Sequence, residues 1–96
     1  MFEVRSTPTF TGWLHDLRDR QARARIIVRI ERVEAGNFGD HKSVGDGVSE
    51  LRITYGPGYR VYFTRHGDAV VLLLCGGDKS TQAADIKEAK RLAREL

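Results

Sequence analysis

Hydrophobic positions near the start of the chain repeat with two periods, one typical of a strand and one typical of a helix. Residues 1–6 alternate apolar and charged side chains, which predicts a short strand with one buried face. From residue 10 the apolar positions recur at helical spacing, as Phe10, Trp13, Leu14 and Leu17. This spacing predicts a short amphipathic helix, with Thr7 or Thr9 as its cap.

A second helix is expected between Asp19, which can cap it, and Gly36, which supplies a stop. Its apolar stripe consists of Ala22, Ile26, Ile27, Ile30 and Val33. With the first helix it predicts an antiparallel helical hairpin.

The outward face of this hairpin is rich in arginine. Six arginines lie on it: Arg18, Arg20, Arg23, Arg25, Arg29 and Arg32. Arg25, Arg29 and Arg32 stand at helical spacing. The acids that can partly neutralise the face are Asp19, Glu31 and Glu34. We therefore expect a solvated helix face here rather than a dedicated binding stripe.

After a glycine-rich loop, the pattern changes to that of strands. Three strands are predicted, at residues 48–55, 59–66 and 69–76. The loop itself is expected to hold one more short strand, around residues 40–44. The connectors, Gly56-Pro57-Gly58 and His66-Gly67-Asp68, are short and turn-rich, so the strands should form an antiparallel meander. The last strand is apolar on both faces, which suits a central strand covered by helices.

The chain ends in a helix that Ser80 or Thr81 opens. Its core-facing side chains are expected to be Ile86, Ala89, Ala93 and Leu96. The order of elements, β-α-α-(β)-β-β-β-α, predicts one domain over residues 1–96. Its class is α+β, with an N-terminal strand, a helical hairpin packed on an antiparallel sheet, and a C-terminal helix.

Composition narrows the possible functions. Twelve of the 16 cationic side chains are arginine, and the net charge is +3. Arginine binds phosphates with two parallel donors and stacks on bases, so nucleic acid is a plausible partner, although a GC-rich genome would also favour arginine codons. The lone Cys75 excludes a disulfide framework, and no metal site or cofactor is expected. The absence of a signal peptide and of a long apolar run predicts a cytoplasmic protein without a membrane partner.

The alternation of the strands places two arginines together. Arg52 and Thr54 share one face of their strand, Arg60 and Tyr62 share one face of the next, and neighbouring strands can bring both arginines onto one surface. Since the hairpin needs the apolar face, we expect the arginine face to be free for a ligand. From the residues alone, an ion pair of Arg60 with Glu50 or Asp78 is as well supported as a contact with phosphate.

Three segments carry a resemblance to a known family: "GNFGDHKSV", "ELRI-YGPGYRVYF" and "LLCGGDKSTQ-ADI-A". In this order and spacing they resemble the RelE/ParE superfamily of bacterial toxins, and within it the HigB-like group of addiction module killer proteins, from Phe10 to Leu96. The resemblance implies a compact toxin and a cognate antitoxin, commonly a helix-turn-helix protein encoded by the adjacent gene. It also implies one of two targets, mRNA in the ribosomal A site or DNA gyrase.

RNA cleavage of the RelE type is metal-independent, because the 2′-hydroxyl of the substrate attacks the adjacent phosphate. By resemblance, Arg60 matches the phosphate-binding arginine, Arg52 a basic position in the preceding strand, and Lys79 falls near a further catalytic arginine. Tyr62 completes the set of candidate catalytic residues. The candidate RNA-binding residues are Arg52, Arg60, Lys79, Lys42 and His41.

The chain departs from the RelE pattern at two positions. A second basic position is Thr54 here, and the C-terminal tyrosine has no counterpart, so the general base is not identified. The nearby candidates are Tyr62, Tyr55, His41 and His66. We favour a ribosome-dependent mRNA endonuclease. The alternatives are a ParE-like gyrase inhibitor and a non-catalytic remnant that only binds an antitoxin.

Overall fold

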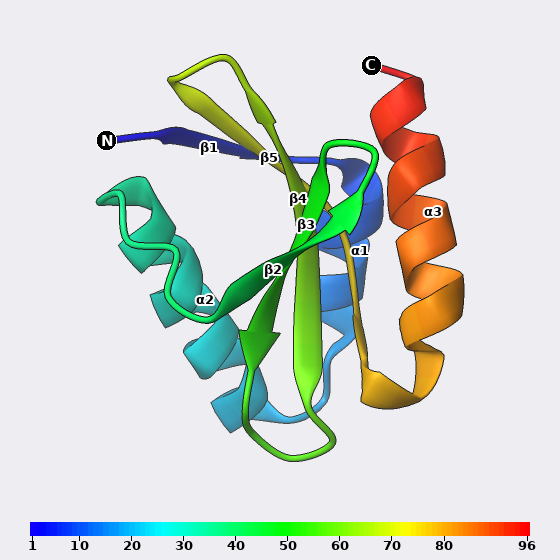
Figure 1. Ribbon diagram of the computed structural model, residues 1–96. Coiled ribbons are helices and arrows are strands. Elements are labelled where there is room, and N and C mark those ends of the chain that lie inside the picture. Colours follow the sequence, from blue (N-terminus) through cyan, green and yellow to red (C-terminus); the bar gives the residue numbers. More distant parts are fainter.

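A five-stranded sheet with helices on both faces forms the protein in a computed structural model that describes residues 1–96 (Figure 1). The elements are β1 (Glu3–Ser6), α1 (Pro8–Asp16), α2 (Arg20–Glu34), β2 (His41–Gly45), β3 (Val48–Ile53), β4 (Tyr59–His66), β5 (Val70–Asp78) and α3 (Gln82–Arg94). A short 3₁₀ turn, Lys79–Thr81, precedes α3. All the helices and strands expected from the sequence are present, and so is the α+β class. None of the three helices has both the length and the apolarity needed to cross a membrane.

The strands lie in the order β1-β5-β4-β3-β2. Strands β3, β4 and β5 form the predicted antiparallel meander, and β2 extends it by pairing antiparallel with β3. The expected N-terminal strand and antiparallel sheet are present, and the one parallel pair that the sequence did not predict joins them: β1 pairs with β5, with Glu3 opposite Val70. Alternation along a strand reveals its buried face but neither its neighbour nor its direction. The sheet is therefore mixed.

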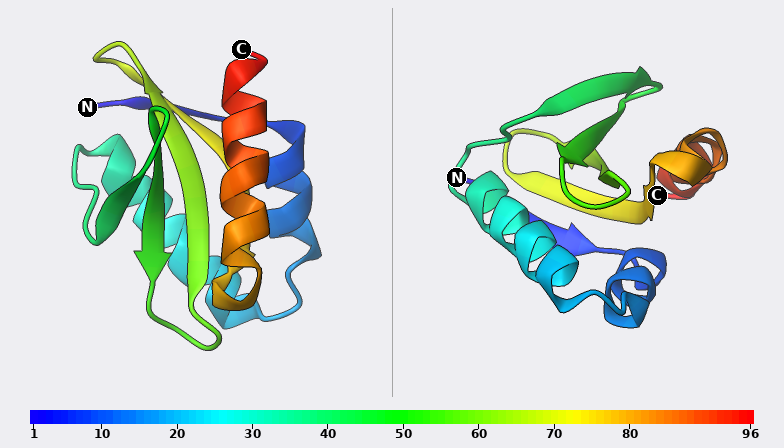
Figure 2. Two further views of the ribbon diagram at one scale, coloured as in Figure 1. Left: turned by 45° about the vertical axis from the view of Figure 1, so that its right-hand side comes forward. Right: turned by 90° about the horizontal axis from the view of Figure 1, so that it is seen from below.

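Helices α1 and α2 cover one face of the sheet (Figure 2). Both begin at a side-chain cap: Thr7, rather than Thr9, accepts the N–H of Phe10 at 3.1 Å, and Asp19 accepts the N–H groups of two residues of α2. The buried side chains of this layer are Phe10, Ala22, Ile26, Val33, Leu51, Ile53, Tyr59, Val61, Phe63, Val71 and Leu73. This layer is the main core of the protein.

Helix α3 covers the opposite face (Figure 2). A second cluster fills this layer: Val48, Tyr62, Leu74, Cys75 and Ala89. A bulge in β5 helps to form it, because Tyr62 pairs with Cys75 but Phe63 pairs with Leu73, so that Leu74 is an extra residue. Leu74 and Cys75 consequently both pack on the α3 side. The expectation that Leu96 reaches the core is wrong, since it lies beyond the end of α3 and is exposed.

Two glycines near the end of β5 allow side chains from both layers to approach the strand. A Cβ atom at Gly76 would overlap the ring of Trp13 from α1, and one at Gly77 would overlap the carboxylate of Asp85 from α3. In contrast, a Cβ atom at Gly12, inside α1, would meet nothing within 4 Å. The close packing at this end of the sheet thus depends on the glycines of β5.

We expect Gly76→Ala to lower the free energy of unfolding by about 1–3 kcal/mol, because the Trp13 ring has to shift. Gly12→Ala, the matched control, should raise it by roughly 1 kcal/mol through helix propensity. Urea denaturation followed by Trp13 fluorescence measures both changes. Equal small effects would contradict the described contact between Trp13 and β5.

Candidate functional site

Strands β3 and β4 place Arg52 and Arg60 directly opposite each other, on the α3 side of the sheet. The prediction that the two arginines share a face is therefore confirmed. Like charges at opposing positions repel, and each arginine has an acidic partner. Arg52 donates to Oδ1 of Asp40 at 3.1 and 2.8 Å, and Nη1 of Arg60 donates to Oε2 of Glu50 at 2.8 Å.

The two ion pairs differ greatly in burial. The side chain of Arg52 is 37% exposed, whereas those of Arg60 and Glu50 are only 13% and 2% exposed. The amide of Gln82, at the start of α3, donates to the other oxygen of Glu50 at 3.2 Å. The expectation that the arginine face is free for a ligand is therefore wrong at Arg60, because α3 packs there. The sequence supported either an ion pair of Arg60 or a contact of Arg60 with phosphate, and the ion pair with Glu50 is present.

Tyr62 lies in the same layer and is completely buried. Its hydroxyl has no hydrogen-bond partner. Burial, and after it the nearby carboxylate of Glu50, raises the pKa of this phenol, so it stays protonated near neutral pH. In this arrangement Tyr62 packs against α3, and its hydroxyl is buried.

Cys75, the cross-strand partner of Tyr62, is also no candidate nucleophile. Its thiol is buried and contacts the carbonyl oxygen of Asp85 at 3.6 Å. Burial raises the pKa of this thiol to about 12, which leaves almost no thiolate at neutral pH.

Lys79 joins Arg52 and Arg60 at one end of the sheet. It is the first residue of the 3₁₀ turn, and its Cβ atom lies 3.7 Å from the position that a Cβ atom at Gly58 would occupy. Figure 1 shows this turn and the β3–β4 loop at the same end of the molecule. Lys79 is exposed, and Gly77, which precedes it in β5, is the cross-strand partner of Arg60.

The two candidates on β2 face opposite sides of the sheet. Lys42 pairs with Glu50 and so projects on the same side as Arg60, whereas His41 pairs with Leu51, on the core side. Nδ1 of His41 lies 2.9 Å from the carbonyl oxygen of Gly39, and its ring packs on Phe38. Of these two residues, only Lys42 thus lies on the same face of the sheet as Arg52 and Arg60.

Tyr55 and His66, the other candidates for a general base, lie away from Arg52 and Arg60. The hydroxyl of Tyr55 donates to Asp19 and Gln21 near the start of α2. His66 is exposed at the end of β4 farthest from the β3–β4 loop.

Glu50 is the site residue that the candidate list omitted. It is an acid in a strand of buried apolar residues, and alternation places it on the same face as Arg52 and opposite Tyr62. This acidic residue among buried apolar positions was the feature of the sequence that could have identified Glu50 as a site residue. A carboxylate 2.8 Å from a guanidinium can accept a proton from a hydroxyl while the cation neutralises charge on a phosphate.

The arginines of α2 are less neutralised than the sequence suggested. Asp19 caps the helix and accepts the hydroxyl of Tyr55, and neither Glu31 nor Glu34 forms an ion pair. These three acids therefore do not neutralise the arginines of α2 through ion pairs, as the sequence had suggested.

No group of three His, Cys, Asp or Glu side chains is arranged to hold a metal ion.

Comparisons with known proteins match almost the whole chain. The model of the family described as "Phage derived protein Gp49-like (DUF891)" matches residues 13–96. A protein of Haemophilus influenzae (strain ATCC 51907 / DSM 11121 / KW20 / Rd), described as an uncharacterized protein, is 55% identical over 94 residues, which cover 98% of this chain and 95% of that protein. No solved structure matches.

The burial of the Glu50–Arg60 pair predicts a large difference between two arginine substitutions. Arg60→Met leaves the carboxylate of Glu50 buried without its cation, which should lower the free energy of unfolding by about 3–5 kcal/mol. Arg52→Met removes an exposed pair and should cost only about 0–1 kcal/mol. The double variant Glu50→Gln/Arg60→Met should recover part of the loss, because no buried charge remains. Similar losses for Arg52→Met and Arg60→Met, measured by urea denaturation, would contradict the assignment.

Tyr62→Phe removes a buried hydroxyl that has no partner, so stability at neutral pH should be unchanged or rise by roughly 1 kcal/mol. Because the pKa of Tyr62 is raised in the folded state, its contribution is fully present below about pH 10 and is lost as the pH rises further. Wild type should therefore lose more stability than Tyr62→Phe above that pH.

The matched control is Tyr55→Phe, which loses two hydrogen bonds and should be destabilised by about 1 kcal/mol at neutral pH. Urea denaturation at neutral and alkaline pH separates the two variants. A clear loss of stability in Tyr62→Phe at neutral pH would show that its hydroxyl has a partner.

Proposed function

Because the chain belongs to the phage-derived Gp49-like family, a family of toxin-like proteins of the RelE/HigB type, we propose that it is the toxin of a type II toxin–antitoxin pair. Its proposed activity is the cleavage of mRNA on the ribosome. Its proposed partner is a cognate antitoxin, a helix-turn-helix protein encoded by the adjacent gene. The resemblance of the three quoted segments to HigB-like toxins supports this assignment.

The pairing of Arg60 with Glu50 is the observation that supports the nuclease most directly. Cleavage of RNA through its own 2′-hydroxyl needs a proton acceptor and a cation for the phosphate, and these two groups lie 2.8 Å apart. Nε and Nη2 of Arg60 have no hydrogen-bond acceptor within the chain, so they are available to phosphate oxygens. The partly exposed Arg52 and the exposed Lys79 add positive charge at the same end of the sheet.

In the proposed reaction, the 2′-hydroxyl attacks the adjacent phosphorus, and the bond from phosphorus to the 5′-oxygen of the next nucleotide breaks. Glu50 accepts the proton of the hydroxyl, Arg60 neutralises the charge that develops on the phosphate oxygens, and Lys79 protonates the leaving oxygen. The products are a 2′,3′-cyclic phosphate and a 5′-hydroxyl. The reaction consumes no metal ion, cofactor or second substrate.

Access to Glu50 requires a local rearrangement, since its side chain is 2% exposed and is bonded by Gln82. Gln82 is the first residue of α3 and directly follows the 3₁₀ turn. In the proposed substrate complex, Gln82 withdraws from Glu50 and the scissile phosphate lies between Arg60 and Lys79.

The same burial favours a second candidate function, a ParE-like inhibitor that binds DNA gyrase without cutting RNA. Tyr62 and Glu50 are fully covered, and of the candidate site residues only Arg52, Lys42 and Lys79 offer exposed or partly exposed positive charge on this side of the sheet. A protein that only binds its target, or only its antitoxin, needs no more than such a surface. The candidate functions differ in their cellular effect: an mRNA nuclease stops translation, whereas a gyrase inhibitor causes DNA breaks.

Induction of the chain without its neighbouring gene should stop protein synthesis and produce RNA 5′ ends within codons, which sequencing of RNA 5′ ends would map. Glu50→Gln preserves the size of the side chain and one of its two acceptor oxygens but cannot accept the proton, so it should reduce cleavage by roughly 100-fold or more. Gln82→Ala leaves Glu50 more accessible and should keep or raise activity. Arg94→Ala, in the exposed last turn of α3, is the matched control and should cut like wild type.

DNA breaks with continuing translation would instead identify a gyrase inhibitor. A harmless induction together with tight binding to the neighbouring gene product would identify a binding module. Full cleavage by Glu50→Gln would remove Glu50 from the reaction.

A further inference from the structure

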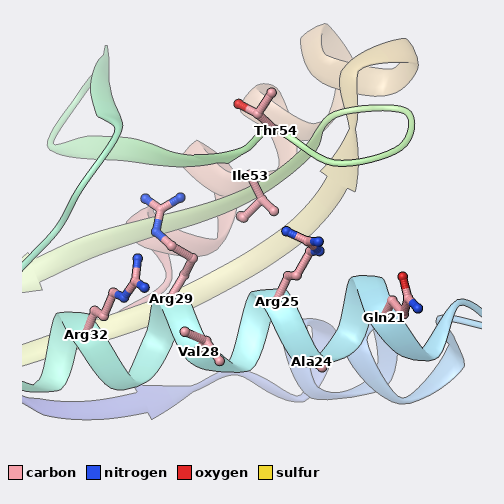
Figure 3. A pocket seen from close by; sticks show the side chains of 8 residues that line it. All are labelled: Gln21, Ala24, Arg25, Val28, Arg29, Arg32, Ile53 and Thr54. Atoms are coloured by element: carbon pink, nitrogen blue, oxygen red, sulfur yellow. The ribbon is translucent and has the colours of Figure 1, made fainter.

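A groove lined by arginines separates α2 from β3, on the side of the sheet away from α3 (Figure 3). Its volume is about 530 Å³. The side chains that matter here are three arginines, Arg25, Arg29 and Arg32, and three apolar residues, Ala24, Val28 and Ile53. No acidic side chain lines the groove.

Arg29 makes the inner wall of the groove positive. Its guanidinium donates to the carbonyl oxygens of Arg52, Phe38 and Asp40 at 2.5, 3.0 and 3.0 Å. These are backbone dipoles and not carboxylates. Burial lowers the pKa of Arg29, an effect that the nearby carboxylate of Asp40, itself paired with Arg52, only partly offsets. The charge of Arg29 is therefore held partly out of water without an ion pair, which favours an anion nearby.

The other two arginines leave their charge open to a ligand. The guanidinium of Arg25 stacks over the ring of Tyr55, at 4.6 Å from the ring centroid, and forms no ion pair. Arg32 is exposed, also without an ion pair. Along α2 the three arginines occupy positions i, i+4 and i+7, so they follow the groove over roughly 10 Å.

The groove also presents apolar surface. Val28 is 43% exposed, and so is its neighbour Ile27; the other large exposed hydrophobic residues, Met1 and Leu96, are the chain ends. A ligand made of phosphates alone would leave Val28 uncovered. Bases would find no aromatic ring to stack on, because none of the residues that line the groove is aromatic.

We propose that this groove binds an acidic, amphipathic peptide segment of a partner protein. Apolar side chains of the segment pack on the exposed Val28 and Ala24, and its carboxylates pair with Arg25 and Arg32. The groove and the Glu50–Arg60 pair lie on opposite sides of the sheet, so the inference does not depend on RNA cleavage, and either can fail alone.

The test uses the full chain, isotope-labelled for NMR, and a synthetic peptide of roughly four helical turns. The peptide carries leucine at helical spacing and glutamate elsewhere. We expect saturable binding, with shifts concentrated at residues 24–32 and 53–54. The double variant Arg25→Glu/Arg32→Glu should weaken binding at least roughly tenfold, and Val28→Asp should weaken it similarly. Arg94→Glu, with the same type of charge reversal on α3, should bind the peptide like wild type.

Two further ligands make the result decisive: a peptide of the same composition with its leucines out of helical spacing, and a single-stranded RNA dodecamer. Arg29 is left unchanged because it donates hydrogen bonds to three backbone carbonyl oxygens. Of the substituted side chains, only Arg25 has a specific contact, with the ring of Tyr55. The variants should therefore fold normally and keep the wild-type NMR spectrum. Absence of binding, shifts outside the groove, or equal binding of the rearranged peptide would overturn the proposal. So would RNA that binds in the groove more tightly than the peptide and is unaffected by Val28→Asp.

Discussion

The ion pair between Glu50 and Arg60 depends on a sheet that is covered on both sides. Helices α1 and α2 cover the main core, and α3 lies over the other face, where the pair is held between strands and helix. A buried charge is tolerated only with a partner, so Arg60, Glu50 and Gln82 have to be placed together. The position of the first turn of α3, which carries Gln82, therefore depends on the ion pair between Glu50 and Arg60 in the sheet beneath it.

This arrangement separates two positively charged regions. On the α3 side, Arg52, Arg60 and Lys79 lie at one end of the sheet, where Arg60 pairs with the buried carboxylate of Glu50. On the α2 side, the groove at Arg29 combines positive charge with apolar surface and contains no acid. The two regions differ in the chemistry that they can bind, so the proposed target and the proposed partner can use separate surfaces.

Much of the fold could be predicted from local patterns. Alternation and helical spacing located every helix and strand, and the short glycine turns predicted the meander that sets Arg52 opposite Arg60. The cover over Arg60 could not be predicted, because the helical spacing in α3 shows which of its faces is apolar but not which part of the sheet that face covers. The bulge at Leu74 interrupts the alternation in an all-apolar strand, where the sequence carries no mark of it. Glu50 was noted as a partner for Arg60 but not as a reactive group, since strand patterns do not report burial by a distant helix.

In the proposed reaction, Glu50 and Arg60 act on RNA that is cleaved through its own 2′-hydroxyl. The most direct measurement uses the purified chain and ribosomes programmed with two messages that differ at the A-site codon, one all-ribose and one with a single 2′-deoxynucleotide at the scissile position. The account predicts that the all-ribose message is cut to a 2′,3′-cyclic phosphate and a 5′-hydroxyl, while the 2′-deoxy message stays intact. Cleavage of both messages, or of neither, would contradict it.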